Sequence, residues 1–279
     1  MKKVLLSLAA AVLVFTGCGK KVDRLEEFKT AFSSIKSAEV KMEVKASLAQ
    51  DGMNIDVNIP MTMKVSEKGV YAKLEKNTFI EQDIELYGSI EKEKVTLYIP
   101  SFDEEFNIGE GFMKLELDLN DESLKDYTEG LDEVKEEDVD KYLTDKVIVF
   151  VEEKDGLDHY QVVINDELLE QIAKDYNEEF EKTNMEIKFD VYIDSKAKTL
   201  AKIEFDFKDL IANNMAGLED LTDGEDFDPE MIKTFLLTIE FKNVNNTTVT
   251  IPQSVIDNAT SLSGSNDVET DGLESAITG

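Results

Sequence analysis

The sequence predicts an α+β protein in which a long, curved antiparallel β-sheet of about eleven strands, a half-barrel, wraps a few amphipathic helices. Apolar and polar residues alternate along many segments, turn residues separate these segments, and a few others repeat at helical spacing. Strict alternation gives a strand one apolar and one polar face, which is typical of antiparallel sheets. The apolar fraction of 42% is ordinary for a globular protein, so the chain can bury a core.

The N-terminal segment has the properties of a bacterial signal peptide. Lys2 and Lys3 precede the apolar run Val4–Phe15, which is too short to span a bilayer because a spanning helix needs roughly 20 apolar residues. We therefore expect residues 1–17 to be removed on export, so that the mature chain begins at Cys18, the only cysteine. A single cysteine cannot form an internal disulfide, so disulfides do not stabilise the exported fold.

The end of this segment resembles the lipobox of bacterial lipoproteins. It reads Val14-Phe15-Thr16-Gly17-Cys18, with small residues before the cysteine and a Phe where Leu is commoner. The resemblance implies lipidation of the Cys18 thiol, cleavage after Gly17, acylation of the new amino terminus with chains such as palmitate, and anchoring in the cell membrane, facing outside the cytoplasm. Several acyl chains anchor stably where one is marginal. The alternative is an ordinary secretory signal with an incidental cysteine.

The mature chain is strongly acidic. Removing residues 1–17 takes Lys2 and Lys3 from the 30 basic residues and none from the 61 acidic residues, so the formal net charge becomes −33. Such a charge repels nucleic acid and anionic lipid headgroups, which excludes a nucleic-acid partner. A solvated surface that faces the cations of a cell envelope accounts for the charge, and a charge-specific role is the alternative.

The first folded element is a predicted helix from Asp23 to about Ser37, which follows a lipidated tether over residues 18–22. Acidic residues at its start favour the N-terminal end of a helix. Its apolar residues recur at helical spacing: Leu25, Phe28, Phe32 and Ile35.

Two long strands follow, over Val40–Leu48 and Met53–Val65, and a turn separates them. Every second residue is apolar in each strand. At roughly 3.3 Å per residue the second strand would be about 40 Å long, and strands of that length usually curve. Pro60 predicts a bend or a sheet edge. Shorter strands are predicted near residues 70–74, 84–90, 95–99, 113–119, 146–153, 160–164, 185–193, 201–207 and 234–243.

The strongest helix signal begins at Asn165 or Asp166, either of which can cap it, and its apolar stripe extends from Leu168 to Phe180. Shorter helices are expected near residues 139–143, 210–218 and 254–259, and the acidic stretch 120–138 is predicted to be a loop. We expect residues 23–260 to form a single domain and residues 261–279, rich in Ser, Gly and Asp, to be a disordered tail.

No residue set specifies a metal or a catalytic chemistry. His159 is the only histidine and has no second soft ligand, so zinc is not expected and His159 is predicted to lie at the surface or at a strand edge. The best calcium candidate is Glu219–Glu230, where Asp223, Gly224 and Glu230 match loop positions, but Glu219 and Leu221 break the pattern. A solvated acidic loop is therefore the expectation there, with calcium binding as the alternative. We expect no cofactor and no enzymatic activity.

The layout of helices and strands resembles the LolA/LppX-like half-barrel lipoproteins over roughly residues 22–260. The segments that carry this resemblance are the leading helix Leu25–Ser37, the hairpin corner Tyr192–Lys196 and the closing Val249–Val255. The resemblance implies a hydrophobic cavity between sheet and helices, which carries lipid or lipoprotein acyl chains in some members. Apart from Cys18, it transfers no functional residue to this chain.

The strands offer more apolar side chains on one face than the helices can cover, so this face must close on itself or on something else. We therefore expect a monomeric lipoprotein that binds a lipid or another hydrophobic ligand. Met53, Met61 and Met63 suit either a plain core or an adaptable binding surface. The alternatives are a sheet that packs against its own face and a ligand-free protein-interaction or structural module with an acidic surface.

Overall fold

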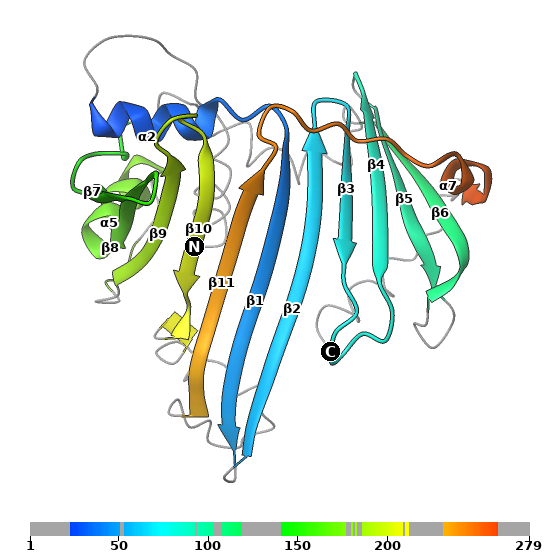
Figure 1. The fold of residues 1–279 in the computed structure, drawn as a ribbon, viewed down its shortest axis with the longest axis horizontal. Helices are drawn as coiled ribbons and strands as arrows, with labels where there is room; N and C mark the ends of the chain where they lie inside the picture. Colours follow the sequence, from blue (N-terminus) through cyan, green and yellow to red (C-terminus); the bar gives the residue numbers. More distant parts are fainter. Residues whose placement is uncertain are drawn as a thin grey trace.

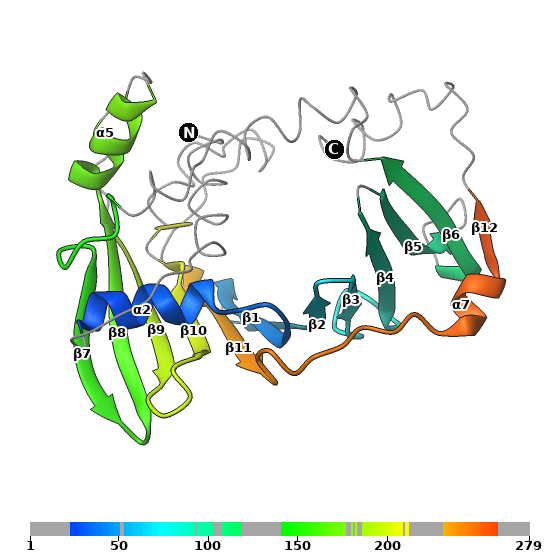
Figure 2. The same ribbon diagram turned by 90° about the horizontal axis from the view of Figure 1, so that it is seen from above.

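The structure, a computed structural model, describes residues 23–261 apart from 51–52, 93, 103–107, 119–140, 177–179, 181, 183–185, 209 and 212–230. All twelve described strands belong to one sheet with the order β12-β6-β5-β4-β3-β2-β1-β11-β10-β9-β8-β7. The sheet is open, and in Figure 2 it bends into a U. The predicted fold class, a long curved antiparallel sheet with a few helices, is confirmed.

Eleven of the strands lie where the alternation predicts them, and the helices α2, α5 and α7 lie beside the two ends of the sheet (Figure 1). The helices are α2 Arg24–Ser33, α5 Asp166–Asp175 and α7 Gln253–Asp257. The strands are β1 Ala38–Gln50, β2 Met53–Ser66, β3 Gly69–Leu74, β4 Ile84–Glu91, β5 Lys94–Phe102, β6 Ile108–Asp118, β7 Ile148–Lys154, β8 Leu157–Asn165, β9 Glu186–Asp194, β10 Leu200–Asp206, β11 Ile232–Lys242 and β12 Ala259–Ser261.

The twelfth strand, β12, was not predicted. It spans three residues and pairs in parallel with β6, with Ala259 opposite Phe112. Three residues are too few to show a period of two, so only the tertiary contact with β6 defines this strand.

Pro60 lies where β2 becomes an edge. The partner β3 pairs with Met61–Ser66 alone, and the last backbone bond on this side, from Glu75 N to Pro60 O, is 3.1 Å long. On the other side β2 pairs with β1 along its whole length. The predicted edge at Pro60 is therefore correct on the β3 side, where the missing N–H donor costs no ladder bond among the described residues.

Helix α2 begins as predicted and ends early. The Asp23 side chain accepts a hydrogen bond from Leu25 N and caps the helix. The helix ends at Ser33 and not near Ser37, because Asn245 takes over the backbone groups that follow: its Nδ2 donates to Ser34 O and its backbone N donates to Ser37 O.

Helix α5 also begins as predicted, with the Asn165 side chain accepting from Leu168 N at 3.0 Å. It ends at Asp175, so the predicted extension of the apolar stripe to Phe180 is wrong. An acidic residue is unfavourable at the C-terminal end of a helix, and the Asp175 carboxylate instead accepts a hydrogen bond of 2.7 Å from the Tyr142 hydroxyl.

The two faces of the sheet pack differently. We call inner face the one that carries Val57, Ile59 and Met61 of β2, and outer face the one that carries their polar neighbours. The main core lies on the inner face at the β7–β10 end, under α2 and α5, while a smaller cluster under α7 joins Tyr87, Tyr98 and Val255. The main core comprises Phe28, Ala31, Phe32, Tyr142, Val147, Ile148, Tyr160, Val162, Ile164, Leu168, Ile172, Val191, Ile193 and Leu200.

Candidate ligand-binding site

The inner face is apolar from one strand to the next. Following the register across β10, β11, β1, β2 and β3, directly opposite residues are Ile203, Ile239, Met42, Met61 and Leu74. No charged or hydrogen-bonding side chain interrupts this row, so the inner face offers apolar contact and no polar anchor along it.

Burial separates the two parts of this continuous face. Under the helices, Tyr160 and Ile193 are 0% exposed, whereas Met53 and Ile55 on β2 are 66% and 46% exposed. The apolar side chains of β1 between Val40 and Leu48 are all only half-buried. The described part of the chain therefore does not pack the central inner face against itself, which was one of the alternatives from the sequence. Apolar patches of this kind usually mark interaction sites.

An aromatic row lies between the covered and the uncovered parts of the face. Ring centroids are 6.0 Å apart for Phe189 and Phe205, 3.8 Å for Phe205 and Phe207, and 5.9 Å for Phe207 and Phe235. All four side chains are half-buried. Broad rings of this type give a hydrophobic ligand a large contact area.

Methionines line the middle of the inner face. Met42 of β1 lies directly opposite Met61 of β2, and Met63 lies opposite Val40. None of the three is buried, so they are not plain core. Because a methionine side chain is unbranched and polarizable, it adapts to ligands of different shapes.

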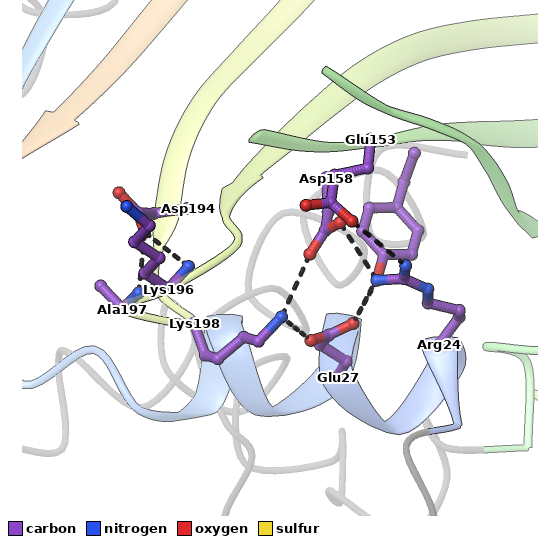
Figure 3. Close-up of polar contacts among 9 residues, drawn as sticks. Arg24, Glu27, Glu153, Asp158, Asp194, Lys196, Ala197 and Lys198 are labelled. Atoms are coloured by element: carbon purple, nitrogen blue, oxygen red, sulfur yellow. Dashed lines mark hydrogen bonds and ion pairs between the residues drawn. The ribbon is translucent and has the colours of Figure 1, made fainter. Parts of the chain in front are cut away.

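A group of charges around the buried carboxylates of Glu27 and Asp158 holds α2 on the sheet (Figure 3). Arg24 Nη1 lies 2.8 Å from Glu27 Oε2 and 3.1 Å from Asp158 Oδ1, and Lys198 Nζ lies 3.2 Å from Asp158 Oδ2 and also pairs with Glu27. The Tyr160 hydroxyl donates to Glu27 Oε2 at 3.2 Å. The group therefore joins the helix to strand β8 and to the β9–β10 turn and fixes where α2 covers the inner face.

The charges in this group compensate one another. Burial opposes the ionisation of Glu27, but hydrogen bonds from Lys198 and Arg24 outweigh it and lower the pKa of Glu27. Burial, together with the Glu27 charge, raises the pKa of Tyr160. Asp158 is fully buried, and its Oδ1 accepts no hydrogen bond from the described residues, so the ion pair with Arg24 is what compensates that oxygen.

The sequence analysis did not predict this group of charges, although the position of Asp158 in the alternation indicated it. Asp158 occupies the same alternating positions as Tyr160, Val162 and Ile164, all of which are buried. A buried carboxylate on an otherwise apolar face requires a partner of opposite charge. The partners come from α2 and from the turn after β9, and only the tertiary structure brings them together.

Of the candidate metal-ligand and lipidation residues named from the sequence, the structure describes only His159. His159 lies near the start of β8, with Nε2 2.7 Å from Asp190 Oδ1 and its ring stacked on Tyr192 at 4.6 Å. Cys18 and the acidic loop Glu219–Glu230 lie outside the described residues, so lipidation and calcium binding stay predictions.

Within the described ranges, no group of three or more His, Cys, Asp or Glu side chains is arranged to hold a metal ion. None of the described helices combines the length and the apolar character that crossing a membrane requires.

Comparison with known proteins gives no family for this chain and only remote structural matches. No protein-family model and no curated protein matches the chain. Among solved structures, a LolA superfamily protein from Nitrosomonas europaea matches with a TM-score of 0.21 and 10% identity, over 90% of this chain and 96% of the other. A DUF1329 family protein from Desulfovibrio piger matches with a TM-score of 0.17 and 12% identity, over 90% and 95% of the two chains. At TM-scores below 0.5, neither match supports a conclusion about this chain.

Proposed function

We propose that this protein is an extracytoplasmic lipoprotein, anchored in the membrane through acyl chains on Cys18, that binds a hydrophobic ligand on the inner face of β11, β1, β2 and β3. The main support for this proposal is that this face is apolar along whole rows of the sheet and yet remains partly exposed. Under this proposal the protein is not an enzyme.

The energetics favour a ligand with long apolar chains. Removing apolar surface from water contributes roughly 25 cal/mol per Å², so covering about 400 Å² gains on the order of 10 kcal/mol before the entropy of binding is subtracted. The row from Ile203 to Leu74 has no charge to pair with a polar ligand. A lipid acyl chain matches both the length and the chemistry of such a row.

The direct test uses the mature chain with Cys18→Ser, which removes the lipid attachment, followed by native mass spectrometry and lipid extraction. We expect a co-purifying lipid, and saturable binding of the apolar probe N-phenylnaphthylamine. Met61→Asn should weaken probe binding because Met61 lies on the inner face, whereas Thr62→Asn on the outer face is the matched control. A ligand-free protein that also binds no probe would contradict the proposal, as would equal effects of the two variants.

The anchor has a separate test. Metabolic labelling with a palmitate analogue should mark the native chain, and Cys18→Ala should abolish the label and release the protein from the membrane fraction. Equal labelling of the variant would exclude lipidation at Cys18.

A second candidate function is a ligand-free protein-interaction module. It is favoured by the edge strand β7, whose Val149 and Val151 are 41% and 49% exposed. An exposed strand edge can pair with a strand of another protein. Cross-linking in cells followed by purification would favour this candidate if one protein dominated the product and no lipid co-purified.

A further inference from the structure

One edge of the sheet differs in charge from the rest of the molecule. We call upper edge the edge that carries α2, the turns β2–β3, β4–β5, β7–β8 and β9–β10, and the strap of residues 243–252 that leads to α7 (Figure 1). Backbone bonds join neighbouring connections along it: Ile90 N to Lys68 O, Ser195 N to Gly156 O, and Asn245 N to Ser37 O.

The upper edge is basic, although the whole chain has a formal charge of −31. Helix α2, together with the described residues of the connections and of the strap, contains seven basic residues and four acids. At the opposite edge, the link 75–83 between β3 and β4 has one lysine and three acids. The basic residues of the upper edge are Arg24, Lys29, Lys36, Lys68, Lys92, Lys196 and Lys198, and its acids are Glu26, Glu27, Glu67 and Asp155.

A pocket of about 470 Å³ opens on this edge, between the link from α2 to β1, the β2–β3 turn and the strap. Lys36 and Lys68 line it, and both are exposed. Glu67 is the one acid in the lining, so the lining has a net positive charge. We call this feature the rim pocket.

The shape of the rim pocket is held by hydrogen bonds that do not involve the lysine ammonium groups. The Asn245 side chain accepts from Lys36 N at 2.7 Å, and Ser37 Oγ accepts from Thr247 N at 3.1 Å. Ser37 is buried, and its hydroxyl hydrogen is left to donate to a ligand. These bonds fix the backbone of the pocket and the Ser37 hydroxyl, and the exposed Lys36 and Lys68 add two ammonium donors for an anion.

The position of the pocket indicates where the anion would come from. Only five residue steps separate Cys18 from Asp23, and five fully extended residues span at most about 18 Å, so a lipid on Cys18 would be attached near the start of α2. Because α2 lies along the upper edge (Figure 1), an anchor at Cys18 would hold this edge close to the bilayer. Acids at the far edge are screened, since the Debye length is about 8 Å at physiological salt.

We propose that the rim pocket binds the phosphate of an anionic lipid headgroup through Lys36, Lys68 and Ser37, and that the upper edge is the membrane-facing surface of the protein. The orientation rests on the proposed anchor at Cys18, whereas the pocket itself does not. A phosphate group suits the site because it offers several strong acceptor oxygens to ammonium and hydroxyl donors.

The test uses the mature chain with Cys18→Ser, so that binding reports the protein surface alone, and measures co-sedimentation with phosphatidylglycerol or phosphatidylcholine vesicles at two salt concentrations. We expect preference for phosphatidylglycerol. The double variant Lys36→Gln and Lys68→Gln should weaken binding roughly thirtyfold. The matched control, Lys76→Gln and Lys146→Gln, removes the same charge from exposed lysines outside the upper edge and should change binding less than about twofold.

Three results would overturn this proposal: no preference for phosphatidylglycerol, equal losses in the two double variants, or binding of inorganic phosphate in the pocket without binding of vesicles, which would indicate a free-anion site. Binding of N-phenylnaphthylamine to the inner face should be the same in both double variants. If the Cys18→Ser chain without further substitutions binds no probe, that result contradicts the proposed function and not the proposal for the rim pocket.

Discussion

The β7–β10 end of the sheet and the central strands β11, β1, β2 and β3 carry the same alternation of apolar and polar residues, yet they are buried to different extents. At the first, Tyr160 and Val191 are completely inaccessible, while at the second no apolar residue of β2 is buried. The difference comes from α2 and α5, which pack on the first region only. Alternation therefore predicts which face is apolar but not what covers it.

This difference separates stability from binding. Covered residues contribute their full transfer free energy to folding, whereas half-exposed residues retain part of theirs for a ligand. Substitutions under the helices should therefore reduce stability, and substitutions in the centre should reduce binding more than stability.

The largest expected effect is at Phe28, whose ring lies 4.8 Å from Phe32 and 5.3 Å from Tyr160. Phe28→Ala should destabilise the protein by about 3–5 kcal/mol because it opens a cavity in the core. Met61→Ala in the open centre should cost roughly 1–2 kcal/mol, since less surface is lost from a half-exposed site. Urea unfolding of the Cys18→Ser chain measures both, and equal losses would show that the two regions are packed alike.

The next effect depends on pH. Glu27→Gln should cost about 1–3 kcal/mol at neutral pH, because it weakens charge-assisted hydrogen bonds to Lys198 and Arg24. The pKa of Glu27 is lowered in the folded state, so its contribution is present above the unfolded pKa of about 4.3 and is lost as the pH falls through the lower folded pKa. The difference in the free energy of unfolding between wild type and variant should therefore disappear at acidic pH. Exposed Glu26→Gln is the control, and a difference that is independent of pH would contradict the assignment.

A smaller effect on stability is expected on the central part of the inner face. Val57→Asp places a carboxylate on the half-buried inner face of β2 and should cost about 1–2 kcal/mol while reducing probe binding. Asn58→Asp, on the outer face beside Glu43, should cost under about 1 kcal/mol and leave probe binding unchanged. Urea unfolding and probe titration distinguish the two, and loss of probe binding in both would mean that the faces are wrongly assigned.

The smallest effect concerns the bond between Tyr142 and Asp175. Burial, then the hydrogen bond to Asp175, raise the pKa of Tyr142 to about 12, and the same bond is the main cause of the lowered pKa of Asp175. Tyr142→Phe should cost about 1 kcal/mol and raise the pKa of Asp175. Carboxylate titration by NMR measures the shift, and an unchanged Asp175 would show that the bond does not form in solution.

The ends of the two longer helices show what local sequence can and cannot predict. The start of the first helix at Asp23 was predicted because acidic residues favour the N-terminal end of a helix, and a cap at Asn165 or Asp166 was predicted because a short acceptor satisfies free backbone N–H groups. The end of α5 at Asp175 was missed, since Phe180 continues the apolar period and the tertiary bond from Tyr142 is absent from any local pattern.

The sequence by itself determined eleven of the twelve described strands, their apolar face and the strong negative charge, because periodicity and composition are local properties that survive in any packing. The tertiary structure decided which part of that face α2 and α5 cover, that Asp158 meets Arg24 and Lys198, and that Lys36 and Lys68 share one pocket. These contacts join residues far apart in the chain, and the free energy that selects them comes from burial and charge pairing across the fold, which no short window of sequence contains.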